Sequence, residues 1–237
     1  MQLKIFGKTY DNPSKRILKD IEPVLFDQDF IKKADKSLVL YYMFRDIAKT
    51  EKDAEILKKL GLRYDITIIP PRLLGVEFVK TLGHYHPIAF DTYSYPEVYQ
   101  VLEGNAIFLI QKPQDDYKKI ERVIAIQAKE KDIVIIPPNY GHVTINPAKD
   151  KTLKMANIVA RDFSSIYEPF KRYRGACYYY LTSGWVRNSN YEKVPEIEFS
   201  DATEFNFFNL SGDLYDYINK PSELKFLVEP QKYKWRL

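Results

Sequence analysis

The feature that most constrains the fold of this chain is a series of short strand-like runs between Tyr64 and Leu181. β-branched and aromatic residues dominate each run, and Pro, Gly, Asn or Asp separates one run from the next. Such closely spaced short strands are typical of an antiparallel barrel or sandwich. Gly104 and Asn105 tolerate positive φ, so we expect a hairpin between the runs on either side of them. The runs are ITII, VEFVKT, EVYQVLE, AIFLIQ, ERVIAIQA, DIVII, HVTIN and ACYYYL.

The two flanking regions have other patterns. Apolar residues keep roughly helical spacing in the segment 35–49, and the segment 51–61 predicts a short helix that ends at Gly61. From about Val186 onward, acidic and aromatic residues are mixed, and no motif among them indicates chemistry. We expect these aromatic side chains to be buried against the barrel or in the interface of a homodimer.

These patterns divide the chain into three parts of one globular unit. We expect an N-terminal helical or extended segment over 1–62, a barrel over 63–185 and a C-terminal extension over 186–237. The predicted fold class is therefore mainly β, with N-terminal helical decoration.

Composition excludes several classes of protein. Of the 237 residues, 45% are hydrophobic and 29% charged, which is the balance of a globular chain rather than a disordered or collagen-like one. The net charge of +4 is small and scattered, so we expect no nucleic-acid partner. The N-terminal segment lacks a signal-peptide core, and no apolar run is long enough to span a bilayer. With a single cysteine, Cys177, these features predict a cytoplasmic protein without a membrane partner.

The three histidines, His84, His86 and His142, are the most informative residues. Side chains alternate between the faces of a strand, so His84 and His86 point to the same side, as two ligands of one metal ion would. A His-x-His pair alone has modest specificity, because a lone histidine is more often a hydrogen-bonded structural residue. Glu97 opens a later strand, and His142 follows a Pro-Pro turn on another. Closure of a barrel would bring these four side chains together around one ion.

The order of these residues resembles the metal-binding motifs of the cupin superfamily, whose fold is a double-stranded β-helix, or jelly roll. More narrowly, the chain resembles the cupin-type glucose-6-phosphate isomerases of archaea and some bacteria. It departs from that family at Thr81, where glycine is common, and in its longer spacer between His86 and Glu97. The narrower resemblance covers about residues 15–185 and rests on YDITIIPP at 64–71, KTLGHYHP at 80–87, PEVYQVLEGNA at 96–106 and PPNYGHVTIN at 137–146.

The resemblance implies a phosphate pocket formed by Thr67, Thr81, Gly83 and Tyr99. Hydroxyls and a backbone amide can hold a phosphate without a glycine-rich helix start. By strand alternation, Thr81 and Gly83 point away from the side that carries the histidines. We therefore expect a twist or bulge near Gly83 that turns these residues toward the ligand.

Three imidazoles and one carboxylate, without a thiolate, suit a divalent first-row ion. We expect one ion per subunit, with Fe(II) first and Mn(II), Ni(II) or Zn(II) as alternatives. The implied activity is interconversion of glucose 6-phosphate and fructose 6-phosphate, a step of glycolysis and gluconeogenesis. Such an ion would bind the C1 and C2 oxygens of the sugar and stabilise the negative charge that develops there.

Two routes for the hydrogen transfer stay open. In a cis-enediol route Glu97 is the base, although a carboxylate bound to a cation has reduced basicity and would have to loosen from it. In a metal-assisted hydride shift, Glu97 remains a ligand or moves hydroxyl protons. Tyr99 shares a face with Glu97 and is expected to assist ring opening or proton transfer.

Other functions also fit these residues. A cupin iron dioxygenase would use the same ligands, and oxygen uptake would distinguish it. A non-catalytic sugar-binding cupin would hold a ligand without converting it, but the intact Glu97 and Tyr99 argue against that hypothesis. Mannose 6-phosphate is an alternative substrate for an isomerase. We expect the basic residues Lys171, Arg172 and Arg174 on a solvated face, outside the site.

Overall fold

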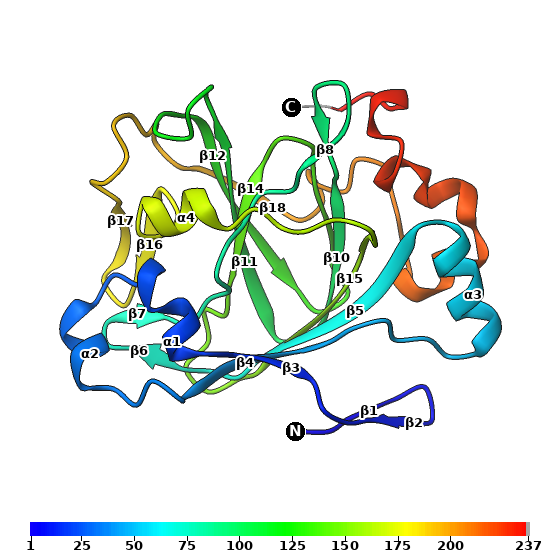
Figure 1. Ribbon diagram of the computed structural model, residues 1–237, viewed down its shortest axis with the longest axis horizontal. Helices are drawn as coiled ribbons and strands as arrows, with labels where there is room; N and C mark the ends of the chain where they lie inside the picture. The colour runs from blue at the N-terminus through cyan, green and yellow to red at the C-terminus, as the bar shows by residue number, and fades with distance from the viewer. Residues whose placement is uncertain (236–237) are drawn as a thin grey trace.

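A computed structural model describes residues 1–235, and most of its strands belong to two antiparallel sheets that enclose a barrel (Figure 1). The strands of the first sheet are, in spatial order, β13 (Ile133–Ile136), β10 (Glu97–Glu103), β15 (Leu153–Ala160), β5 (Leu62–Ile69), β4 (Val39–Phe44) and β3 (Ser14–Ile17). The strands of the second sheet are β14 (Gly141–Ile145), β11 (Asn105–Pro113), β12 (Ile120–Lys129) and, pairing in parallel with β12, β18 (Glu198–Asp201).

The connections between the two sheets are those of a jelly roll. Successive strands pass between the layers: β10 pairs with β13 and β15 in the first sheet, while β11 pairs with β12 and β14 in the second. Isolated bridges join Lys80 to Ile145 and His84 to His142, so the segment 80–85 continues the second sheet beside β14. Strand segments connected in this order form a double-sheet jelly roll. The predicted mainly β barrel is therefore confirmed.

Smaller sheets surround the barrel. A side sheet contains β17 (Gly184–Arg187), β16 (Tyr178–Leu181), β7 (Glu77–Phe78) and β6 (Leu73–Leu74). Two two-stranded ribbons are formed by β1 (Leu3–Ile5) with β2 (Lys8–Tyr10) and by β8 (Ile88–Phe90) with β9 (Tyr93–Ser94). The second ribbon occupies the long spacer between the second and the third predicted ligand.

The helices lie at the two ends of the chain and in the loops. The α-helices are α1 (Leu18–Ile21), α2 (Gln28–Lys33), α3 (Glu51–Lys59) and α4 (Glu168–Arg172). The 3-10 turns are η1 (Glu22–Val24), η2 (Leu214–Asn219), η3 (Pro221–Leu227) and η4 (Pro230–Lys232). None of the helices within residues 1–235 combines the length and the apolar character that a membrane crossing needs.

The helix predicted over 51–61 is confirmed as α3. The Thr50 hydroxyl accepts a hydrogen bond from the Asp53 amide, and the Asp53 carboxylate accepts one from the Thr50 amide. This reciprocal capping box fixes the first turn of the helix. Gly61 follows the last turn with φ of +66°, a conformation that glycine adopts at low cost.

Two local predictions are wrong. The segment 35–49 is not helical, because its residues 39–44 form β4 between β3 and β5. A short apolar run that is buried on both faces has no periodicity that separates strand from helix. Residues 104–105 do not close a hairpin either, because β10 and β11 belong to different sheets. Gly104 lets the backbone of this connection pass close to the backbone of Thr152, since a Cβ there would lie 2.5 Å from the Thr152 carbonyl oxygen.

The C-terminal extension covers the outer face of the first sheet. Buried residues of η2 and η3, among them Tyr215 and Phe226, pack in one cluster with Tyr64 and Ile66 of β5. Figure 1 shows these turns beside α3 at one end of the barrel. The predicted aromatic burial therefore occurs against the barrel. Residues 236–237 of the predicted extension lie outside the described residues.

Candidate metal centre

The register of the first sheet places a row of polar side chains inside the barrel. Tyr99 of β10 is paired with Asn157 of β15, which is paired in turn with Asp65 of β5. Directly paired residues lie on the same face of a sheet, and so do residues two apart on a strand. Glu97 and Thr67 consequently share this interior face with the other three.

The four predicted ligands are brought together at one end of this row. His84, His86, Glu97 and His142 each offer one ligating atom, and these atoms lie within 4.8 Å of one another. The Nε2 atoms of His84 and His86 are 3.1 Å apart. Glu97 Oε2 lies 3.4 Å from His86 Nε2 and 3.3 Å from His142 Nε2. We call these four residues the ligand cluster.

The imidazoles of His84 and His86 are neutral and present lone pairs to the cluster. Burial, followed by the neighbouring histidines His142 and His86, lowers the pKa of His84 well below its usual value. Burial also lowers the pKa of His86 to about 4, although the charge of Glu97 opposes this effect. His86 Nδ1 lies 2.9 Å from the Tyr95 carbonyl oxygen, which accepts its proton, so Nε2 is the free acceptor.

Glu97 is ionised, and one of its oxygens has no partner. Burial raises its pKa, but the neighbouring imidazoles of His142 and His86 outweigh burial and leave the pKa below its usual value. Glu97 Oε1 accepts a 2.7 Å hydrogen bond from Asn157 Nδ2. Oε2 is buried and receives no hydrogen bond from the described residues.

This donor set fits a divalent cation. A buried carboxylate oxygen without a partner is destabilising, and the neutral imidazoles of His84 and His86 cannot supply the missing positive charge. A cation at the centre of the ligand cluster would neutralise Glu97 and coordinate the three imidazoles.

Thr67, Thr81, Gly83 and Tyr99 line the same pocket as the ligand cluster. Gly83 has φ of +80°, and a Cβ there would come within 2.6 Å of the Phe170 ring. The backbone therefore departs from strand alternation at this glycine, which is the expected twist. Thr81 Oγ1 accepts a hydrogen bond from the Thr144 amide, so its own proton is free for a ligand.

Tyr99 is placed as a neutral hydrogen-bond donor. Its hydroxyl lies 3.2 Å from His142 Nε2. Burial, with the Glu97 charge as the next cause, raises the pKa of Tyr99 well above its usual value. The phenol therefore keeps its proton.

The pocket residues that were not predicted from the sequence include five polar or charged ones. These five are Arg16, Arg45, Arg63, Asn157 and Tyr167. Asn157 carried a usable signal, because it is the one polar residue of the apolar run 155–160 within β15. The arginines carried none, since arginine at a strand end is ordinary on a surface.

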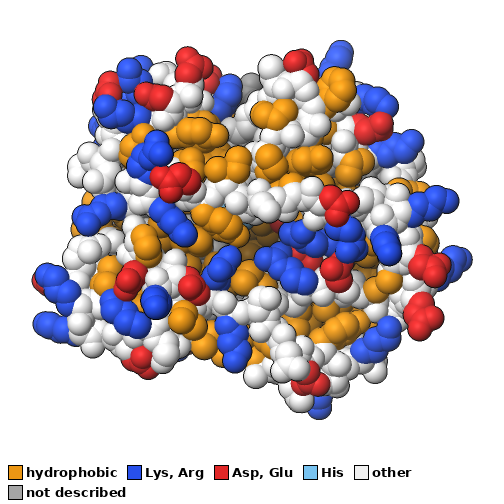
Figure 2. Space-filling view, in the orientation of Figure 1, with side chains coloured by type: hydrophobic (Ala, Val, Ile, Leu, Met, Phe, Trp, Pro, Cys, Tyr) orange, Lys and Arg blue, Asp and Glu red, His pale blue; other side chains and the backbone are white. Residues whose placement is uncertain are grey.

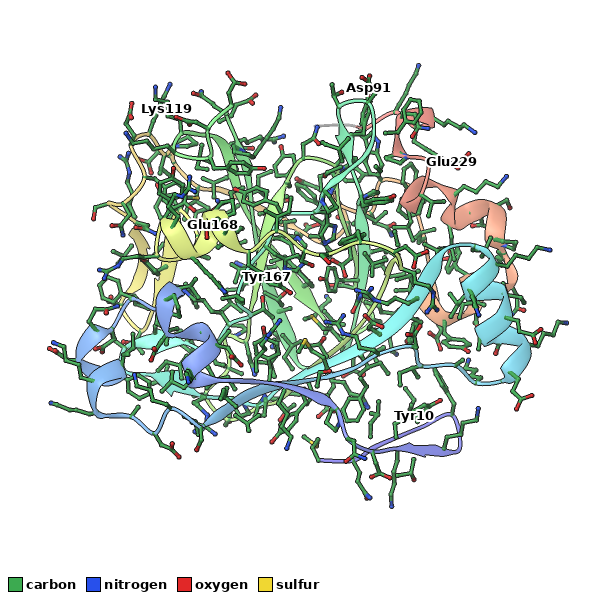
Figure 3. The ribbon with its side chains drawn as sticks, in the orientation of Figure 1. Tyr10, Asp91, Lys119, Tyr167, Glu168 and Glu229 are labelled. Atoms are coloured by element: carbon green, nitrogen blue, oxygen red, sulfur yellow. The ribbon has the colours of Figure 1, made fainter. Side chains whose placement is uncertain are left out.

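The pocket opens on the face shown in Figure 2, where Lys and Arg side chains gather around a central hollow. Figure 3 labels Tyr167 in the middle of this face, at the start of α4. The Tyr167 ring centroid lies 5.5 Å from that of His84, and the Phe163 centroid lies 4.6 Å from that of His86. The segment 161–167 thus covers the ligand cluster. Lys171, Arg172 and Arg174 are exposed and do not line the pocket, as expected.

Comparison with known proteins gives consistent sequence matches. The family model described as "Glucose-6-phosphate isomerase (GPI)" matches residues 15–196. The glucose-6-phosphate isomerase of Thermococcus onnurineus is 26% identical over 156 residues, which cover 65% of this chain and 74% of the relative. That of Thermococcus litoralis is 30% identical over 134 residues, covering 56% and 62%, and that of Pyrococcus furiosus is 28% identical over 162 residues, covering 65% and 76%.

Solved structures resemble the chain more distantly. An oxalate oxidase in complex with glycolate matches with a TM-score of 0.40 and 14% identity, over 56% of this chain and 57% of that one. A vicilin from Capsicum annuum matches with a TM-score of 0.36 and 13% identity, over 53% and 29%. This chain therefore spans about half of the oxidase and less than a third of the vicilin.

Proposed function

The chain belongs to the glucose-6-phosphate isomerase family, and we propose that it interconverts glucose 6-phosphate and fructose 6-phosphate with one bound divalent metal ion. The family confirms the predicted class of enzyme. One observation carries the proposed metal dependence: four ligating groups converge around a buried carboxylate oxygen that has no partner.

In this proposal His84, His86, Glu97 and His142 hold the ion, with Fe(II) first among the candidates and Mn(II), Ni(II) and Zn(II) as alternatives. When bound, a divalent cation stabilises negative charge on the C1 and C2 oxygens of the sugar. The remaining chemistry belongs to side chains of the chain itself.

Glu97 is the proposed proton-transfer group. Asn157 holds Oε1, which leaves Oε2 directed toward the ligand cluster and toward a sugar bound there. Glu97 moves a proton between the two carbons in a cis-enediol route, or between the two hydroxyls in a hydride-shift route. Tyr99 donates its phenolic proton to a sugar oxygen during ring opening.

The phosphate of the substrate is proposed to contact Thr67, Thr81 and the backbone at Gly83. The Thr67 side chain is buried, and the Thr81 hydroxyl proton is free. Hydroxyl and amide donors can hold phosphate oxygens in a site that also excludes water.

Substrate binding also requires the pocket to open. The cavity at the ligand cluster has a volume of about 60 Å³, which suits an ion with bound water but not a hexose phosphate. The segment 161–167 covers the cluster through Phe163 and Tyr167. We therefore expect this segment to move when the substrate binds.

The test is a coupled assay of glucose 6-phosphate formation from fructose 6-phosphate, before chelation, after chelation and after metal restoration. We expect activity that chelation abolishes and metal restores. Lack of turnover in folded, metal-replete protein would contradict the proposal, and oxygen uptake or mannose 6-phosphate turnover would identify the alternatives. A role in glycolysis or gluconeogenesis, a homodimer and a cytoplasmic location remain predictions from the sequence.

A further inference from the structure

Arg16 lines the pocket without a carboxylate partner. Among residues 1–235 no acidic oxygen lies within ion-pair distance of its guanidinium. We propose that Arg16 binds the phosphate group of the substrate and makes the pocket selective for phosphorylated over unphosphorylated sugars. The identity of the sugar rests on the proposed function, whereas the selectivity for a phosphate does not.

The other pocket arginines differ from Arg16. Arg45 and Arg63 both contact Oδ2 of Asp65, at 2.6 and 2.8 Å, and the Asp65 side chain is completely buried. Asp65 also accepts a hydrogen bond from the Asp46 amide. Arg45 and Arg63 are therefore held in place and share one counter-charge, while the charge of Arg16 is free to attract a ligand.

The neighbours of Arg16 are phenols, which do not neutralise it. Its Nη2 lies 3.4 Å from the Tyr167 hydroxyl, and its Cζ lies 5.6 Å from the centroid of that ring. Tyr41 is opposite Arg16 in the register of β3 and β4. Burial raises the pKa of Tyr41 to about 12, so this phenol is uncharged. The half-buried guanidinium is thus oriented by aromatic contacts while most of its N–H donors remain available.

Arg16 lies at the correct end of the pocket for this role. Tyr41 and Met43 are two residues apart on β4, and Met43 is opposite Thr67 of β5. Arg16 and Thr67 therefore share the interior face. Both lie toward the β3 edge of the sheet, whereas Glu97 lies on β10 near the opposite edge. A sugar phosphate whose C1 and C2 oxygens lie at the ligand cluster would extend its phosphate past Thr67 toward Arg16.

Arginine suits this ligand better than a hydroxyl alone. A phosphate monoester carries a charge of about −1.5 to −2 at pH 7. The planar guanidinium can donate two parallel hydrogen bonds to it, and such charge-assisted bonds are stronger than those from neutral donors.

The experiment measures ligand discrimination by isothermal titration calorimetry on metal-loaded protein. The probes are 6-phosphogluconate and gluconate, which differ only in the phosphate. For Arg16→Gln we expect the affinity for 6-phosphogluconate to fall by about ten- to a hundredfold while the affinity for gluconate changes by less than about twofold. Arg16→Lys, which keeps the charge and the aliphatic stem, should show a smaller loss. Arg172→Gln, which removes an equal charge from the exposed face of α4, should match wild type.

Equal losses for both probes, or an unchanged ratio of their affinities in Arg16→Gln, would overturn the proposal. A lower melting temperature with unchanged discrimination in Arg16→Gln would assign Arg16 a purely structural role. Because binding is measured without turnover, absence of isomerase activity would leave this result interpretable. Retained phosphate discrimination in a wild type without isomerase activity would identify a failure of the proposed reaction, whereas absence of discrimination in wild type would overturn the phosphate site itself.

Discussion

Two groups of buried charged side chains differ in whether their hydrogen bonds and charges are complete. In the first, Lys80 forms an ion pair with Glu77 Oε1, and Glu77 Oε2 accepts a 2.8 Å hydrogen bond from the Phe26 amide. Lys80 Nζ also lies 4.9 Å from the centroid of the Tyr179 ring. In the second, the ligand cluster, a carboxylate oxygen of Glu97 has no partner.

The difference separates a structural from a functional use of buried charge. The charges of Glu77 and Lys80 neutralise each other, and both oxygens of Glu77 have hydrogen-bond partners. The role of this pair is therefore to anchor the start of the segment that carries Thr81, Gly83 and His84. The ligand cluster gathers acceptors around an unpartnered carboxylate oxygen, and a bound cation would offset the cost of burying that charge. The same contrast distinguishes Arg45 and Arg63, which share Asp65, from Arg16, which lacks a counter-charge.

The largest expected effect is that of Glu97→Gln on catalysis. The change removes the negative charge of the ligand cluster and the proposed proton-transfer group, so we expect kcat to fall by about a thousandfold or more. The metal-free variant should melt at the same temperature as metal-free wild type or higher, because an unpaired buried charge is gone. Steady-state kinetics and calorimetry measure the two effects. Near-normal turnover would remove Glu97 from catalysis.

Next in size is the effect of Glu77→Gln on stability. This change leaves the Lys80 ammonium buried without its partner, so we expect the free energy of unfolding to fall by about 3–5 kcal/mol. Urea denaturation measures it, and Glu198→Gln, which breaks an exposed pair with Arg122, should cost no more than about 1 kcal/mol. Equal losses in the two variants would erase the distinction between buried and exposed pairs.

Asn157→Ala should have an intermediate effect, on metal affinity. Asn157 fixes one oxygen of Glu97 and so orients the other toward the ion. Loss of such an orienting partner typically weakens metal binding by about ten- to a hundredfold. Competition with a fluorescent chelator measures the affinity, and Asn190→Ala, at an exposed position, is the control. Unchanged affinity in Asn157→Ala would show that the hydrogen bond does not position Glu97.

The smallest expected effect is that of Thr67→Val. The variant keeps the branched shape but removes one neutral donor to the phosphate, so we expect KM to rise by about three- to tenfold with kcat unchanged. Kinetics with fructose 6-phosphate measure this split. A fall in kcat at constant KM would instead place Thr67 at the reacting carbons.

The ligand cluster was predictable because local strand alternation pairs two of its histidines and barrel closure accounts for the other two ligands. His84 and His86 are two residues apart, and the fold brings Glu97 and His142 to them from different sheets, as barrel closure predicts. The twist at Gly83 was also expected from the need to turn Thr81 inward. The mainly β architecture followed from the spacing of the strand-like runs.

The failures share a physical cause, which is that pairing between distant strands is not encoded locally. Residues 39–44 are a strand because β3 and β5 offer partners on both sides. Gly104 lies at a crossing between sheets rather than in a hairpin, and the local turn residues do not distinguish these cases. Asn157 and Arg16 reach the site through the register of the six-stranded sheet. The predicted boundaries near residues 62 and 185 stay predictions. Strands β3, β4 and β18, which lie outside 63–185, pair with strands of the barrel.

The central claim is that four side chains hold one divalent ion, and a metal titration tests it most directly. Metal-free protein is titrated with Mn(II) in wild type and in the double variant Glu97→Gln/His142→Ala, with folding checked by circular dichroism. The account predicts one tightly bound equivalent per wild-type chain and no tight binding in the folded double variant. Absence of binding in wild type, or the same stoichiometry and affinity in both proteins, would contradict it.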